Sequence, residues 1–84
     1  MPDVIKHALV TEKASVLIDK ENSLQFVVDT RASKDRIKRE IEKRFEVKVK
    51  SIRTLVTTDG RKKAIVTLME DYKASEVVAR LGVF

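Results

Sequence analysis

Cysteine is absent from this chain of 84 residues, and its absence excludes both a disulfide framework and a thiolate metal site. The single histidine, His7, has no second histidine with which to form a metal-binding set or a catalytic pair. Two glycines and one proline are too few to provide a flexible linker or a glycine-rich phosphate loop. We therefore expect one domain over residues 1–84 that carries no metal and no cofactor and is stabilised by packing alone.

Long apolar runs are missing as well, since no stretch approaches the roughly 20 apolar residues that a membrane-spanning helix needs. The opening Met1-Pro2-Asp3 lacks the basic and apolar regions of a signal peptide. We therefore expect a cytoplasmic protein without a membrane partner. The acidic residues are dispersed, and with His7 as the one candidate base they supply no nucleophile and no tuned acid and base for catalysis. We expect no enzyme activity and no small-molecule substrate.

Basic residues, by contrast, are abundant and unevenly placed. The chain carries 18 Lys and Arg against 13 Asp and Glu, for a net charge of +5. Between Arg31 and Lys63, 13 basic residues stand against five acidic ones, whereas the rest of the chain is net acidic. If this middle segment gathers on one side of the fold, it presents a basic face that attracts a polyanion. The alternative is a solvated ionic surface of the kind that heat-adapted proteins carry.

The periodicity of the apolar residues predicts an α+β sandwich in which helices cover a small sheet. The predicted strands cover residues 4–8, 24–29, 47–57 and 62–69, and the predicted helices begin at the N-caps Thr11, Ser33 and Asp71. We expect the first helix to stop near Asn22 and the last at Gly82. Asp59-Gly60 favours a tight hairpin turn between the last two strands. The apolar alternation within 47–57 changes phase, which indicates either a bulge or a sheet buried on both faces.

Two lysines of the second predicted helix lie beside its apolar stripe. This stripe consists of Ile37, Ile41 and Phe45. At about 100° per residue, Lys34 and Lys38 fall on or beside the stripe rather than opposite it. Their aliphatic stems must therefore run along apolar surface and deliver the ammonium groups at the rim of the sheet, where these groups can reach a partner.

Two further groups of cations lie in the predicted hairpin. Lys48 and Lys50, with Arg53 as a third candidate, are expected on one side of a strand. Their spacing of roughly 7 Å is comparable with the spacing of phosphates along a nucleic-acid strand. The Arg-Lys-Lys triplet at 61–63 follows the turn, where a flexible basic tip can enter an RNA groove. We interpret these features as favouring RNA contact over a solvated surface.

Aromatic residues are few, namely Phe26, Phe45, Tyr72 and Phe84. Phe26 and Phe45 belong to predicted apolar faces, so the stacking platform with which single-strand readers hold bases is not available. We therefore expect binding to depend on phosphate and ribose contacts to folded RNA of matching shape.

Four stretches of the chain resemble, in order and spacing, the family of the universal large-subunit ribosomal protein number twenty-three. They are KHALVTEKA at 6–14, FVVD with ASK and IK between 26 and 38, FEVKV at 45–49, and TL with DG and KKA between 54 and 64. The resemblance covers nearly the whole chain. It implies a small antiparallel four-stranded sheet packed with about three helices, bound to large-subunit rRNA beside the polypeptide exit tunnel.

The resemblance also implies two protein partners, a neighbouring small helical ribosomal protein and the signal recognition particle, for which the family helps to form a docking platform. The loop from Thr57 to Arg61 is too short for the long hairpin extension of bacterial members. The ending from Asp71 to Gly82 is similar to the archaeal and eukaryotic type, and the lack of the eukaryotic basic N-terminal extension favours the archaeal one. Arg53 stands where the family usually has asparagine, so we expect a charge-assisted phosphate contact there instead of a residue-specific hydrogen bond.

The expected rRNA contacts combine the basic groups with polar residues of the matching stretches. They are His7, Thr11, Lys13, Lys34, Lys38, Lys48, Lys50, Arg53, Thr54, Arg61, Lys62 and Lys63. An alternative from another class is a small regulatory or scaffold α+β domain that binds a ligand or a protein partner. RNA binding predicts an affinity that falls steeply with added salt, whereas a scaffold domain would purify free of nucleic acid and as a dimer.

Overall fold

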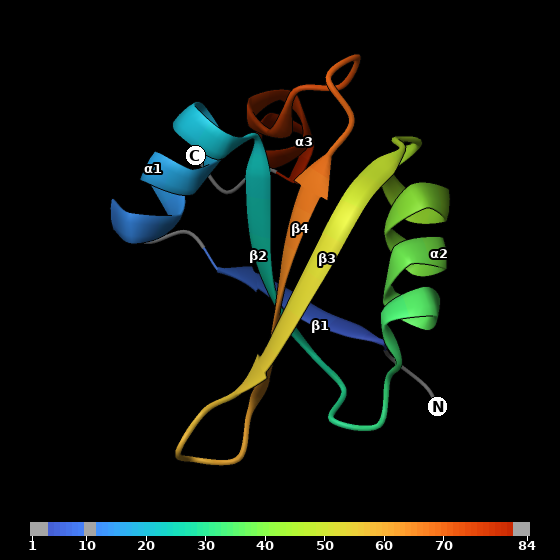
Figure 1. The fold of residues 1–84 in the computed structure, drawn as a ribbon. Coiled ribbons are helices and arrows are strands. Elements are labelled where there is room, and N and C mark those ends of the chain that lie inside the picture. The colour runs from blue at the N-terminus through green and yellow to red at the C-terminus, as the bar shows by residue number, and fades with distance from the viewer. Residues whose placement is uncertain (1–3, 10–11, 82–84) are drawn as a thin grey trace.

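The computed structural model of the chain describes residues 4–9 and 12–81 (Figure 1). Over these ranges strands and helices alternate until a hairpin precedes the last helix. The elements are β1 (Ile5–Leu9), α1 (Glu12–Glu21), β2 (Ser23–Val28), α2 (Lys34–Phe45), β3 (Val49–Val56), β4 (Lys62–Leu68) and α3 (Ala74–Leu81). Each predicted strand and helix is present close to its expected bounds, which confirms the α+β fold class.

The strands form one antiparallel sheet in the order β1-β2-β4-β3. In its centre, Leu24 of β2 lies opposite Val66 of β4, and Phe26 lies opposite Ala64. On the other side of β4, Ile52 of β3 also lies opposite Val66. Residues directly opposite each other in antiparallel strands share a face, so this register collects apolar side chains on one face of the sheet. The four-stranded antiparallel sheet that the family resemblance implies is thus confirmed.

A tight turn joins β3 to β4, as Asp59-Gly60 predicts. The backbone N–H of Thr57 donates a hydrogen bond of 2.7 Å to the oxygen of Arg61, and the N–H of Gly60 donates one of 3.0 Å to the oxygen of Thr57. Gly60 has a φ of 85°, in the left-handed region that glycine adopts without steric cost. The hydroxyl of Thr57 donates in turn to the carboxylate of Asp59. The five residues 57–61 therefore close the hairpin.

The phase change in the third strand is a β-bulge. The pairing of β3 with β4 shifts between Val49 and Ser51, so Lys50 is an extra residue in β3. Val49 is buried before the shift, and Ile52 lies opposite the buried Val66 after it. Without the extra residue, strict alternation would turn either Val49 or Ile52 away from the core.

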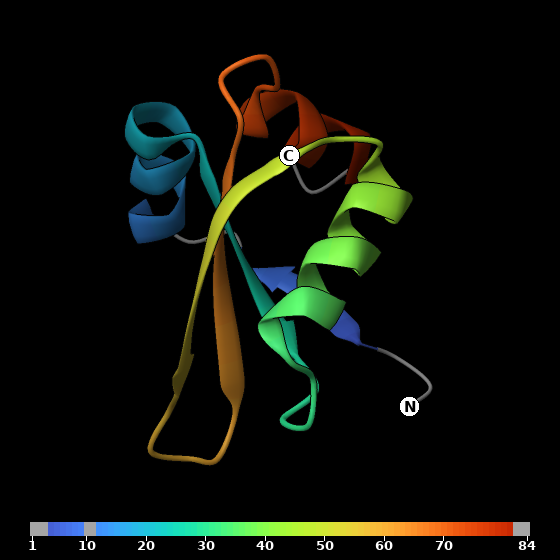
Figure 2. The same cartoon turned by 45° about the vertical axis from the view of Figure 1, so that its right-hand side comes forward.

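The helices cover the sheet from both sides. Figure 2 shows α2 and α1 on opposite sides of the sheet, with α3 across the end at which β4 finishes. On α2, Ile37 and Ile41 are 0% exposed, and Phe45 stacks on Phe26 of β2 with ring centroids 5.9 Å apart. The last helix adds three buried residues to the same core, namely Ala74, Val77 and Val78. The predicted apolar stripe of α2 is thus the part of the helix that covers the sheet.

The ends of α1 and α2 agree with the sequence. Ser33 is the N-cap of α2, because its Oγ accepts a hydrogen bond of 3.2 Å from the backbone N–H of Arg36. Asn22 directly follows α1 and has a φ of 54°, a left-handed conformation that often ends helices. The expected cap Thr11 and the expected stop Gly82 lie outside the described residues.

The start of α3 corrects a prediction. Asp71 does not cap this helix, which begins at Ala74. The backbone N–H of Ala74 donates instead to Oδ1 of Asn22 at 2.7 Å. A local cap has to stand directly before the first helical turn, whereas Asp71 lies in the exposed turn that leads to it. The cap therefore comes from a residue that is distant in sequence.

Candidate nucleic-acid interface

A shallow hollow of about 150 Å³ lies between α2 and β3. Three lysines line it, Lys34 and Lys38 from α2 and Lys50 from the bulge of β3. All three are exposed, while Val49 and Ile52 form the apolar part of the lining. Lys34 and Lys38 therefore do lie over apolar surface at the edge of the sheet, where their helical spacing places them. We call this feature the α2–β3 groove.

The groove is positively charged and held in shape by the backbone. Asp35, in the first turn of α2, is the acid that stands among its three lysines. Glu42 of α2 anchors the start of β3, because its carboxylate accepts a hydrogen bond of 3.0 Å from the backbone N–H of Val49. This bond ties the start of β3 to α2. The two walls that carry the lysines are therefore fixed before any partner binds, which lowers the entropic cost of binding.

The other cations along β3 meet different neighbours. Lys48 precedes the strand and Arg53 follows the bulge, and both are exposed, as Lys50 is. Arg53 lies opposite Ile65 and lines a separate hollow of about 330 Å³ together with Glu21 of α1. The expected row of cations is therefore divided, with Lys50 beside α2 and Arg53 beside α1. The sequence did not predict this division.

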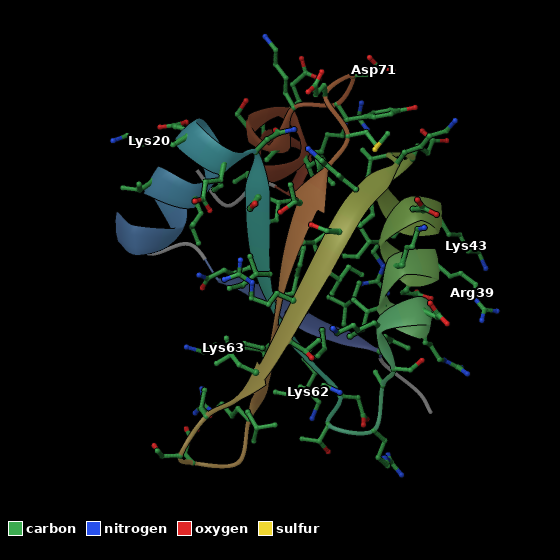
Figure 3. All side chains as sticks on the ribbon, in the orientation of Figure 1. Lys20, Arg39, Lys43, Lys62, Lys63 and Asp71 are labelled. Atoms are coloured by element: carbon green, nitrogen blue, oxygen red, sulfur yellow. The ribbon has the colours of Figure 1, made fainter. Side chains whose placement is uncertain are left out.

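The three cations after the hairpin turn are held apart from one another. Arg61 forms an ion pair with Asp59 at 3.2 Å. The ammonium group of Lys62 donates a hydrogen bond of 2.7 Å to the backbone oxygen of Ala32. Lys62 and Lys63 point to opposite sides of the hairpin, as successive strand residues do (Figure 3). The prediction of one flexible basic tip is wrong, because hydrogen bonds close the turn and the strand alternates its side chains.

One cation that the sequence did not single out, Lys6, lies at this end of the sheet. Together with Arg61 and Lys62 it lines a hollow of about 290 Å³, whose lining also includes Thr30 and Gly60. Three cations around one hollow make it a second place at which a phosphate could bind. No local pattern signals Lys6, because it is a single cation in a short strand and only the strand order brings it near β4.

Four expected contacts remain, namely Thr54, His7, Lys13 and Thr11. Thr54 is half-buried and lies opposite Ala64 on the core face of the sheet, so it faces the protein interior more than a partner. His7 belongs to β1 and Lys13 to α1, but their side chains are outside the described part of the structure. Thr11 lies outside the described residues.

The loop that leads into α2 contains an ionised carboxylate. Nε of Arg31 lies 3.2 Å from Oδ1 of Asp29, and the backbone N–H of Arg31 donates to the same oxygen at 2.9 Å. These hydrogen bonds from Arg31, the side-chain bonds above all, hold the pKa of Asp29 below its ordinary value of 3.8, and the charge of Lys6 adds to the effect. Asp29 therefore stays charged and fixes the loop that positions Lys34.

The described surface offers little chemistry other than its cations. Within residues 4–9 and 12–81, no three acidic, histidine or cysteine side chains gather in a way that could hold a metal ion. Over the same ranges, none of the helices has the length and apolarity needed to cross a bilayer. Phe26 and Phe45 are 1% and 6% exposed, so neither can stack on a base. Exposed cations beside shallow hollows can bind an extended polyanion.

Comparison with known proteins identifies the family. The family model described as Ribosomal protein L23 matches residues 3–61. The large ribosomal subunit protein uL23 of Haloarcula marismortui is 51% identical over 82 residues, which cover 98% of this chain and 96% of that protein. The protein of the same name from Methanococcus aeolicus is 43% identical over 82 residues, which cover 98% of this chain and 95% of that protein. The chain therefore belongs to the ribosomal protein L23 family and is a protein of the large ribosomal subunit, located on the ribosome in the cytoplasm.

Proposed function

We propose that this protein is a structural component that binds large-subunit rRNA beside the polypeptide exit tunnel. The observation that carries the proposal is the similarity to two archaeal large-subunit proteins along 98% of the chain. The structure supports it with a surface that suits RNA, because exposed lysines gather at the α2–β3 groove. The position beside the tunnel rests on the family resemblance of the motifs.

The groove would bind RNA through phosphates rather than through bases. Lys34 and Lys38 present ammonium groups at the end of flexible stems, and Lys50 faces them from the bulge. Such groups neutralise phosphates and release condensed counterions, and this release supplies most of the affinity and makes it depend on salt. The buried aromatic rings exclude base stacking by Phe26 and Phe45. Recognition would then rest on the shape of a folded rRNA segment that places its phosphates against this rigid surface.

We infer two protein partners from the same resemblance, a neighbouring small helical ribosomal protein and the signal recognition particle. For both, the motifs that match the family carry the proposal. The proposed function is also non-catalytic, because a structural ribosomal protein works by holding RNA and protein neighbours in place. No observation favours the alternative of a regulatory or scaffold domain, since the family accounts for nearly the whole chain.

The test is co-sedimentation with the large ribosomal subunit of an archaeon, followed by washes of increasing salt. The protein should remain with the large subunit at low salt and be released as the salt concentration rises. Binding to protein-free archaeal large-subunit rRNA should follow the same salt dependence. A protein that sediments apart from the large subunit at low salt and ignores this rRNA would contradict the proposal.

A further inference from the structure

The outer face of α2 carries a second set of cations, which is separate from the α2–β3 groove. Arg36, Arg39 and Lys43 follow one another at spacings of three and four residues, which places them on one side of the helix. That side is opposite the buried residues Ile37 and Ile41, and all three cations are exposed. Figure 3 shows Arg39 and Lys43 pointing away from the sheet. We call these three residues the α2 outer row.

The outer row makes no ion pair among the described residues. Three acids lie near the row on the helix. Glu40 is held by Arg44 at 3.3 Å, and Glu42 accepts the hydrogen bond from the backbone N–H of Val49. Asp35 stands four residues before Arg39 but forms no ion pair with it. Neighbouring positions of the row carry like charges three and four residues apart, and such pairs destabilise a helix. The positive charge of the row is therefore not neutralised by any ion pair within the described residues, and it suits an anionic partner.

The geometry of the row fits a nucleic-acid backbone. At a rise of about 1.5 Å per residue, Arg36 and Lys43 are separated by about 10 Å along the helix axis. Neighbouring phosphates along one nucleic-acid strand lie roughly 7 Å apart, so the row spans about two phosphates. Two of the three cations are arginines, whose planar guanidinium groups can hold a phosphate with two hydrogen bonds.

The row and the groove face different directions around the helix. At about 100° per residue, Lys38 is separated from Arg39 by about 100° and from Lys43 by about 140° around the axis. We propose that the outer row binds a second rRNA strand, so that α2 lies between two phosphate backbones. The inference rests on the proposed function, because it takes rRNA as the partner. It goes further in placing RNA on a face of the protein that is turned away from the sheet.

The binding test uses two variants that each lose two positive charges. Arg39→Gln with Lys43→Gln alters the row, and Lys20→Gln with Lys73→Gln alters exposed lysines of α1 and of the turn before α3. Binding to protein-free archaeal large-subunit rRNA is measured across a salt series. The row variant should bind more weakly, with a slope of log affinity against log salt that is shallower by about 2, whereas the control slope should match the parent protein. Thermal unfolding of the row variant should be unchanged or slightly raised, which separates lost contacts from lost folding.

A second measurement locates the two strands. Because the chain has no cysteine, Arg39→Cys, Lys38→Cys and Lys20→Cys each provide one attachment point for an iron chelate that cleaves nearby RNA. The proteins carrying Arg39→Cys and Lys38→Cys should cut the bound rRNA in two different strands, and the protein carrying Lys20→Cys should cut neither.

The outcomes separate this inference from the proposed function. If the parent protein binds the rRNA but the row variant keeps its affinity and slope, the inference is wrong, and the row faces solvent or an acidic protein surface. Cuts from Arg39→Cys that coincide with those from Lys38→Cys would overturn it as well. A parent protein that fails to bind rRNA at low salt overturns the proposed function itself.

Discussion

The ammonium group of Lys62 donates a hydrogen bond of 2.7 Å to the backbone oxygen of Ala32. This bond ties the first residue of β4 to the loop that leads into α2. Ala32 is only 1% exposed, so few other donors can reach its oxygen. Lys62 therefore has a structural role in addition to its charge, although the sequence shows it as one of a run of cations. Its neighbour Lys63 points to the other side of the hairpin (Figure 3).

Replacing Lys62 by methionine should destabilise the protein. The change Lys62→Met keeps the aliphatic stem but leaves the oxygen of Ala32 without its donor. Hydrogen bonds that involve a charged group contribute about 1.5–3 kcal/mol, so we expect the free energy of unfolding to fall by about that amount. The matched control is Lys63→Met, which should change it by less than about 0.5 kcal/mol. Urea denaturation of both variants tests this prediction. Equal midpoints of unfolding for Lys62→Met and Lys63→Met would contradict the structural role of Lys62.

Asn22 is expected to be the most sensitive polar residue of the fold. Its side-chain amide donates to the oxygen of Tyr72 at 2.6 Å and accepts from the N–H of Ala74 at 2.7 Å, so it joins the end of α1 to the start of α3. Asn22→Ala loses these bonds and places an alanine at a φ of 54°, so we expect a loss of about 2–4 kcal/mol in thermal or urea unfolding. Asn22→Gly keeps the backbone relaxed and should lose less. An equal loss in both variants would show that the backbone conformation contributes nothing.

Acid should weaken the fold through Asp29. Its pKa in the folded protein lies below the ordinary value of 3.8, chiefly because of the hydrogen bonds from Arg31. The unfolded chain therefore takes up a proton first, and the stability that Asp29 contributes is complete above about pH 5 and lost as the pH falls through the folded pKa. The midpoint of urea unfolding is measured from pH 6 to 2.5. The Asp29→Asn protein should have a lower midpoint than the parent at pH 6, and its midpoint should fall less as the pH is lowered. The exposed Asp71→Asn serves as control and should follow the parent curve.

The α2–β3 groove makes its own prediction for RNA binding. Lys34→Gln with Lys38→Gln removes two of the three lysines that line it, without touching a buried residue. For binding to archaeal large-subunit rRNA, the slope of log affinity against log salt should be shallower by about 2, because about one phosphate contact disappears with each lysine. The Lys20→Gln with Lys73→Gln protein again supplies the control for net charge. An unchanged slope in the groove variant would show that Lys34 and Lys38 do not contact the RNA.

Helices, strands and the hairpin could be read from the chain because each depends on neighbours in sequence. The spacing of Ile37, Ile41 and Phe45 predicts which face of α2 is buried, and Ser33 predicts where the helix begins. The same spacing places Lys34 and Lys38 at the edge of the sheet. The family resemblance of the motifs was also visible without coordinates. All of these features rest on local periods of two or 3.6 residues, or on short motifs.

The cation sites required the tertiary structure. Whether Lys50 and Arg53 share a surface depends on where the bulge falls and on which helix covers each side of β3, and neither follows from the strand alone. The bond from Lys62 to Ala32 and the cap that Asn22 provides for α3 join segments that are distant in sequence.

By itself, then, the sequence determined the kinds of element, the buried stripe of α2 and an excess of positive charge in the middle of the chain. The tertiary structure decided which of those charges face a partner and which hold the fold together. The physical reason is that a side chain's role depends on the groups it meets in space, and the strand order β1-β2-β4-β3 selects those groups from the whole length of the chain.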